Sequence, residues 1–112
     1  MARKGARGSR IAEGKIGLPY FVYILASRPR GAIYVGSTSD LRKRVEQHWS
    51  KAVPGHTARY NIYTLVWFEM HDTLEVALMR EHRIKRWRRG WKDEMIASRN
   101  VEWRDISDQI PL

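Results

Sequence analysis

The chain has no cysteine among its 112 residues. Disulfide bonds, thiolate metal sites and cysteine nucleophiles are therefore excluded, and a reducing compartment fits this composition. No stretch comes near the roughly 18 consecutive apolar residues that a membrane-spanning helix requires. No apolar segment follows the basic N-terminus, so a signal peptide is not expected. We therefore expect a cytoplasmic protein with no membrane partner, and the length suits one domain.

Acidic residues are few compared with basic ones. Asp and Glu number 12, Lys and Arg number 21, and the formal net charge is +9. Basic residues gain affinity for polyanions by releasing counterions from phosphates, so this excess favours a nucleic-acid partner. An anionic membrane or an acidic protein is the second possibility, and charge that serves only solubility is the third. Residues 1–18, rich in Gly, Arg and Lys, indicate a basic flexible arm ahead of a single domain at 19–112.

The apolar pattern of that domain predicts strands and helices in the order β-β-α-β-α-α. Aromatic and β-branched runs indicate the strands, and apolar residues three and four apart indicate the helices. Three strands with helices segregated around them give an α+β fold, a small three-stranded antiparallel sheet flanked by helices. The third strand is apolar on both faces for part of its length, so we expect it to be central or covered. The expected elements span residues 20–26, 31–36, 41–51, 62–70, 74–88 and 91–98.

The first two strands form a predicted hairpin that carries two tyrosines. If its turn is symmetric about Ser27–Arg30, Tyr23 lies directly opposite Tyr34. Opposite residues in an antiparallel pair share a face of the sheet. The two phenols would then lie side by side on one surface. The alternative is an aromatic cross-strand pair that only packs.

The first expected helix carries Arg44 and His48, four residues apart and therefore on one flank. Both side chains could reach over the edge of the sheet, where an arginine can hold a phosphate with its planar fork of donors. The alternative is a solvated basic face, because Arg42 and Lys43 are neighbours on the same helix. The apolar stripe that this flank borders consists of Leu41, Val45, Trp49 and Ala52.

The long helix carries a carboxylate, Glu81, on its apolar stripe. An unpaired charge there would cost several kcal/mol unless it were neutralised or paired. A metal ion would remove that cost, and oxygen ligands suit Mg²⁺, which keeps several waters and takes only one or two carboxylates. The alternative is a buried ion pair, for which Arg44 is a candidate partner. The stripe is formed by Leu74, Ala77, Leu78 and Ile84.

Basic and aromatic residues surround this glutamate. Seven Lys and Arg residues lie between positions 80 and 92, with Trp87 and Trp91 interleaved among them. Such a stretch suits a phosphate backbone, and stacking on a base is one use for the tryptophans. We expect instead that the tryptophans belong to the core.

Four segments together resemble one nuclease family. Residues 22–24 (VYI) and 34–36 (YVG) resemble the paired signature of the GIY-YIG nuclease superfamily. Residues 37–44 resemble the stretch that leads to its helix arginine, and residues 77–81 resemble the segment that holds its metal-binding glutamate. This resemblance covers most of the domain. Within the superfamily, the sequence is similar to small stand-alone bacterial members of the endonuclease type. Phe21 stands where the first signature has glycine, a position that varies between members.

The resemblance implies a divalent-metal-dependent endonuclease that cuts nucleic acid, with DNA as the expected substrate. Tyr23 and Tyr34 would orient and help deprotonate the attacking water, and Arg44 would stabilise charge on the phosphate. His48 would support the reaction or act as the base, and Glu81 would bind one Mg²⁺ or Mn²⁺. A tyrosine with a pKa of about 10 is a poor base at pH 7, so we expect nearby positive charge to lower its pKa. Nucleic-acid contacts are expected from Arg42, Lys43, Arg59, Tyr60, Arg83, Arg86 and Asn100, and His56 lies in a loop that could approach the site.

Two other functions are compatible with the sequence. One is a catalytically inactive nucleic-acid-binding module that uses the same basic surface. The other is a small protein-interaction domain whose charge keeps it soluble. A steep loss of DNA binding with rising salt would exclude the interaction domain. Metal-dependent strand scission would separate the nuclease from the binding module.

Overall fold

The centre of the molecule is a three-stranded antiparallel sheet. This computed structural model describes residues 19–51 and 55–111, with His56 described by its backbone alone, so the basic arm expected at residues 1–18 lies outside the described residues. The strands follow the order β2-β1-β3, and both neighbouring pairs are antiparallel. The α+β class and the antiparallel sheet are as predicted. The strands are β1 (Tyr20–Ala26), β2 (Ile33–Thr38) and β3 (Thr64–His71).

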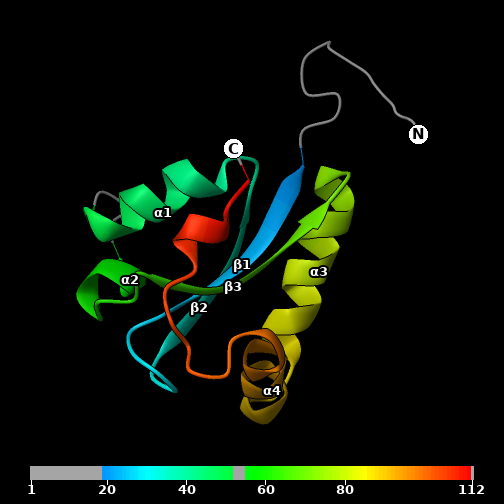
Figure 1. Cartoon of the computed structure of the whole chain (residues 1–112). Helices are drawn as coiled ribbons and strands as arrows, with labels where there is room; N and C mark the ends of the chain where they lie inside the picture. Colours follow the sequence, from blue (N-terminus) through cyan, green and yellow to red (C-terminus); the bar gives the residue numbers. More distant parts are fainter. Residues whose placement is uncertain (1–18, 52–54, 112) are drawn as a thin grey trace.

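Helices lie on both faces of this sheet (Figure 1). Asp40 caps the first long helix by accepting from the Lys43 amide at 3.1 Å, and Thr73 caps the next by accepting from the Val76 amide at 3.2 Å. A short helix stands where the sequence predicted a loop. None of the helices in the described part of the chain is long and apolar enough to cross a membrane. The helices are α1 (Leu41–Trp49), α2 (His56–Arg59), α3 (Leu74–Arg86) and α4 (Arg89–Arg99), with a 3-10 turn, η1 (Ser107–Gln109).

Strand β1 supplies both hydrophobic cores, because its side chains alternate between the two faces of the sheet. Phe21, Tyr23 and Leu25 point toward α1 and join one core, while the alternate residues point toward α3 and α4 and join the other. The central strand is therefore β1. The third strand was expected to be central or covered, and it is covered: β3 is an edge strand, but Leu65, Val66 and Trp67 in its first half are buried.

Helix α3 presents a narrower buried face than the sequence suggested. Ala77 and Ile84 are fully buried, but Leu74 and Leu78, expected to face inward, are each 48% exposed. The helix is rotated so that Ala77 and Ile84 meet the sheet, and Glu81 lies beside this buried line. The break between the last two helices also lies at a different position from the predicted one. Residues 87–88 adopt extended backbone between α3 and α4, and the glycine expected to break the helix lies inside the first turn of α4.

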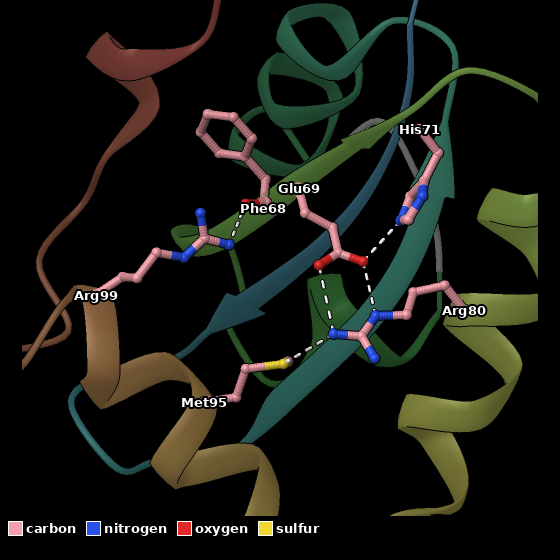
Figure 2. A network of polar contacts seen from close by, with 6 residues as sticks. All are labelled: Phe68, Glu69, His71, Arg80, Met95 and Arg99. Carbon is pink, nitrogen blue, oxygen red and sulfur yellow. Dashed lines mark hydrogen bonds and ion pairs between the residues drawn. The ribbon is translucent and has the colours of Figure 1, made fainter.

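A polar network fastens α3 and α4 to the edge strand β3 (Figure 2). Glu69 on β3 accepts from Arg80 of α3 at 2.7 Å and contacts His71 at 2.6 Å. Arg80 also reaches the sulfur of Met95 on α4, and Arg99 of α4 donates to a β3 carbonyl at 3.0 Å. Partial burial favours the neutral acid, but the bonds from Arg80 and His71 outweigh it and hold the pKa of Glu69 below its usual value.

Candidate active site

The hairpin places its two tyrosines on one face, with a register different from the predicted one. Tyr23 pairs with Gly36, and Tyr34 pairs with Leu25. The turn spans residues 27–32, longer than the symmetric four-residue turn, so the register is shifted by two. Direct opposition is therefore wrong, but a shift of two preserves the face. The ring centroids lie 6.2 Å apart.

Gly36 leaves the space that the Tyr23 ring fills. A Cβ atom built on Gly36 would lie 2.7 Å from the Tyr23 hydroxyl and 2.9 Å from a ring carbon of Tyr34. The Tyr23 ring thus lies against the backbone of β2, which is an edge strand. The missing side chain lets the phenol extend across the edge strand, so this glycine is a structural part of the site.

His48 is the third ring of the cluster. Its centroid lies 5.5 Å from that of Tyr34 and 6.4 Å from that of Tyr23. The side chain is buried, and Nδ1 forms a 3.0 Å hydrogen bond with the hydroxyl of Thr57, which is buried as well. Burial, followed by the charge of Arg44, lowers the pKa of His48, so this imidazole is neutral at pH 7. Thr57 is a partner that the sequence patterns did not indicate.

Two polar atoms in this cluster have no hydrogen-bond partner among the described residues. They are the hydroxyl of Tyr23 and Nε2 of His48, and both are buried. The indole nitrogens of Trp67 and Trp103 share this property, but an indole can only donate. The phenol and imidazole can also accept, so this pair suits a small polar ligand such as water or a phosphate oxygen.

Tyr23 is held in its protonated form. Burial is the main cause that raises the pKa of Tyr23, with Tyr34 and Glu81 adding to the rise and Arg44 opposing it. The expectation that positive charge would lower a tyrosine pKa is therefore wrong for Tyr23, because loss of hydration outweighs the single guanidinium. At pH 7 Tyr23 can donate a hydrogen bond but is not a ready base.

Arg44 brings a positive charge to this cluster from α1. Its charge acts on both Tyr23 and His48. It forms no ion pair with any acid in the described part of the chain. A guanidinium that stays charged and has no carboxylate partner is suited to a phosphate. A polar hollow of about 330 Å³ opens beside it, lined by Thr38, Ser39, Asp40, Lys43, Arg44 and Gln47.

Glu81 approaches the same edge strand from the opposite face of the sheet. Its carboxylate accepts from the Ser37 hydroxyl of β2 at 2.5 Å and pairs with Lys85, one turn along α3, also at 2.5 Å. The side chain is only 17% exposed, whereas that of Lys85 is 48% exposed. The partner considered from the sequence, Arg44, does not form this ion pair. Ser37 was missed because only the strand register shows which face it occupies.

The donors around Glu81 fit one kind of metal ion. A carboxylate and the Ser37 hydroxyl are both hard oxygen donors, and the described residues contain no group of three or more His, Asp or Glu that could hold a metal. A cation that keeps most of its own waters needs no more than this, and Mg²⁺ behaves in that way. The ammonium of Lys85 would have to give up its place on the carboxylate.

The predicted contacts on α1 and α2 lie near this cluster in sequence but are more exposed. Arg42 donates to the carbonyl of Ile110 at 3.2 Å, so it links α1 to the C-terminal segment. Lys43 is exposed and borders the polar hollow beside Arg44. Arg59 lies 5.8 Å from the ring of Tyr60, which is 52% exposed. Of His56, only the backbone is described.

The remaining predicted contacts lie apart from the rings. Arg83 and Arg86 are exposed on α3. Asn100 ends α4 and donates to the carbonyls of Val66, on the far edge strand β3, and Arg104, while its oxygen accepts from the Arg104 amide. The structure therefore brings together Tyr23, Tyr34, Arg44, His48 and Glu81 but leaves Asn100 at the other edge of the sheet.

Sequence relatives of this chain are known. Residues 19–94 match the model of the GIY-YIG catalytic domain. A UPF0213 protein of Clostridium perfringens is 29% identical over 92 residues, covering 82% of this chain and 98% of the relative. A UPF0213 protein of Staphylococcus aureus is 35% identical over 80 residues, covering 71% and 96%. The solution NMR structure of a UPF0213 protein from Bacillus halodurans matches with a TM-score of 0.49 and 24% identity, over 78% of this chain and 92% of that one.

Proposed function

Since this chain belongs to the GIY-YIG catalytic-domain family, we propose that it is a metal-dependent endonuclease that hydrolyses phosphodiester bonds of nucleic acid, with DNA as the expected substrate. The observation that carries this proposal is the pair of buried, unpartnered polar atoms on Tyr23 and His48. Arg44 and Glu81 both act electrostatically on that tyrosine. A nucleophile, a phosphate and a cation could therefore meet at one edge of the sheet.

The attacking water is positioned by the ring cluster. When the Nδ1 hydrogen of His48 is donated to Thr57, Nε2 presents its lone pair and can accept a proton from the water. The protonated hydroxyl of Tyr23 donates a hydrogen bond to the same water. The water oxygen then bonds to phosphorus as the bond to the leaving oxygen breaks. Tyr34 completes the wall of this space through its contacts with both rings.

Arg44 stabilises the charge that develops on the phosphate. Its guanidinium can donate two parallel hydrogen bonds to phosphate oxygens. Glu81 and Ser37 would hold the divalent metal, Mg²⁺ or Mn²⁺. Such an ion stabilises negative charge on phosphate and leaving-group oxygens when it is bound. The Glu81 carboxylate and the three rings lie on opposite faces of the sheet, with β2 between them.

Nicking of a supercoiled plasmid tests this proposal directly. We expect nicking by the purified full chain with Mg²⁺ or Mn²⁺, none with EDTA, and loss of nicking in Glu81→Ala and Arg44→Ala. DNA binding measured without divalent metal should survive in Glu81→Ala. Arg104→Ala is a matched control for lost charge, because Arg104 is exposed and pairs only with Glu102 among the described acids.

Two results would overturn the proposal. Nicking that continues unchanged in Glu81→Ala would exclude Glu81 as the metal ligand. Binding of duplex, single-stranded and branched DNA without scission in either metal would assign the basic surface to a binding module instead.

A further inference from the structure

The corner between α3 and α4 exposes one tryptophan. Trp91 is 49% exposed, while Trp67 and Trp103 are each 2% exposed and Trp87 packs partly against the core. The expectation that both interleaved tryptophans are core residues is therefore wrong for Trp91. Its position in the first turn of α4 directs it away from the core. An aromatic side chain this large, left half in water, has apolar surface available to a partner.

Neighbouring side chains hold the Trp91 ring in place. The guanidinium of Arg88 lies 5.1 Å from its centroid, and the Trp87 ring meets it at 6.2 Å with an interplanar angle of 80°. A cation over an aromatic face stabilises its orientation. Trp91 is thus an ordered ring with a cation beside it, which reduces the entropic cost of binding a planar ligand.

Positive charge lies beside this ring, at Arg88, and on the exposed surface of the preceding helix, α3. In the described part of the chain, other cations of this region have acidic partners: Arg80 pairs with Glu69, Lys85 with Glu81, and Arg89 with Asp93. Glu94, exposed three residues after Trp91, forms no ion pair with a described cation. Between positions 80 and 92, the basic residues that pair with no described acid are Arg83, Arg86, Arg88 and Lys92. Lys92 donates to the carbonyl of Lys85, which leaves the three arginines for a ligand.

This combination fits a strand of nucleic acid whose bases are not paired. The arginines can contact successive phosphates, and an aromatic ring stacks on the face of any base. In a duplex each base is already stacked on its neighbours, so only an unpaired base gains from Trp91. Helix α3 carries Glu81, Arg83 and Arg86, while Arg88 is the N-cap residue of α4. Arg86 lies about 8 Å along the helix axis from Glu81 at 1.5 Å per residue. The corner therefore extends the candidate site along the same helix.

Resting on the proposed nuclease function, we propose that the α3–α4 corner binds an unpaired nucleotide of the substrate, with the base stacked on Trp91 and the phosphates held by Arg83, Arg86 and Arg88. The enzyme then prefers nucleic acid with a single-stranded segment next to the cleaved bond. A blunt duplex would bind through the arginines alone.

The test is the affinity of the full chain, without divalent metal, for a labelled thymidine oligonucleotide and for a blunt duplex of equal length. Trp91→Ala should lower the affinity for the oligonucleotide by about 5- to 100-fold, the usual effect of losing one stacked base. Its affinity for the duplex should change less than about twofold. Trp91→Phe should keep most of the binding, whereas Trp91→Leu, which keeps apolar volume without a π face, should not.

Trp49→Ala is the matched control, because Trp49 is 54% exposed but lies at the end of α1. It should leave the ratio of the two affinities unchanged. Unchanged oligonucleotide binding in Trp91→Ala, or an equal loss for both ligands, would overturn the stacking proposal. Far-ultraviolet circular dichroism and thermal melts of each variant separate misfolding from lost stacking.

These measurements need no cleavage, so the two proposals fail separately. If the preference for the oligonucleotide depends on Trp91 but the protein never nicks DNA, the stacking proposal is supported and the nuclease proposal is rejected. Metal-dependent nicking in a protein indifferent to Trp91→Ala would do the reverse.

Discussion

Two carboxylates of this protein, Glu69 and Glu81, lie at opposite edges of one sheet. Helix α3 reaches both edges through two consecutive residues. Arg80 reaches across to Glu69 on β3, and the next residue, Glu81, reaches Ser37 on β2. Glu69 is 21% exposed and Glu81 is 17% exposed, so burial does not distinguish them. Their partners do. Glu69 has Arg80 and His71 in a network that also includes α4 (Figure 2).

Glu81 has partners that can be replaced. One is a neutral hydroxyl, and the other is the ammonium of Lys85, a flexible side chain that is 48% exposed. A carboxylate held by a positioned guanidinium and a neighbouring imidazole serves the fold. A carboxylate of equal burial that has only a hydroxyl and a displaceable amine retains the capacity to bind a metal ion. The difference between the two edges is therefore a difference in how firmly each acid is neutralised.

The largest expected effect comes from Glu81→Gln. Metal-dependent nicking should fall by at least about 100-fold, the cost of losing one electrostatic contact to the reacting phosphate. The free energy of unfolding should change by less than about 1 kcal/mol, because the lost ion pair is with an exposed lysine. Plasmid nicking and urea unfolding measure the two quantities. A large loss of stability with normal nicking would show that Glu81 is a structural acid like Glu69.

The next effect comes from Gly36→Ala, which fills the space beside Tyr23. The new methyl group would lie 2.7 Å from the tyrosine hydroxyl, so the ring must move. We expect a loss of about 1–3 kcal/mol in stability from overpacking and a fall of about 10- to 100-fold in nicking from misplacement of the hydroxyl.

The control for this substitution is Gly90→Ala in α4, where a Cβ would meet nothing within 4 Å. It should leave nicking unchanged and should not lower stability, since alanine favours the helix. Equal effects of the two glycine substitutions would contradict the role given to Gly36.

At the other edge, Glu69→Gln should act on the fold and only weakly on nicking. It removes the charge shared with Arg80 and His71, and we expect a loss of about 1–2 kcal/mol, reduced by their partial exposure. Arg80→Met should cost a similar amount. The double variant should cost little more than either single variant, because both remove one network. Additive losses in this cycle would show that the bond between them contributes nothing.

The pH dependence of stability provides a second test of Glu69. Its pKa in the folded protein lies below the usual value of 4.5. A depressed carboxyl pKa means that the stabilisation is fully present above the unfolded pKa and is lost as the pH falls through the folded pKa. The stability difference between the wild type and Glu69→Gln should therefore be constant near neutrality and shrink below about pH 4.5. A difference that persists at pH 2 would contradict this origin.

The sequence predicted features that depend on short spacing and left out those that depend on packing. Period-two and helical patterns predicted the α+β sheet fold, and the shared face of the tyrosines survived a register error because that error was even. The sequence could not predict that Ser37 lies beside Glu81 or that Thr57 lies beside His48. The first pair is separated by 44 positions in the chain and the second by 9, so each pair meets only in the folded protein. Nor could the pattern show that burial raises the pKa of Tyr23 by more than the charge of Arg44 lowers it.

The smallest expected effect tests whether the partner of Glu81 can be displaced. Lys85→Met removes the ammonium that neutralises this carboxylate but keeps an unbranched side chain. If a metal ion and the ammonium compete for the same oxygens, the concentration of Mn²⁺ needed for half-saturation should fall by about 2- to 5-fold, in line with the small free energy of exposed ion pairs. Electron paramagnetic resonance of free Mn²⁺, without DNA, measures this quantity.

Lys92→Met is the control for this measurement, because it removes the same charge from a side chain that donates to the Lys85 carbonyl and does not contact Glu81. Removing a general positive charge would favour Mn²⁺ equally in both variants, so only a larger effect of Lys85→Met supports direct competition. If Lys85→Met instead weakens Mn²⁺ binding, the ammonium orients the carboxylate for the metal. The two edges of the sheet would then differ in the identity of their cations and not in how firmly those cations are held.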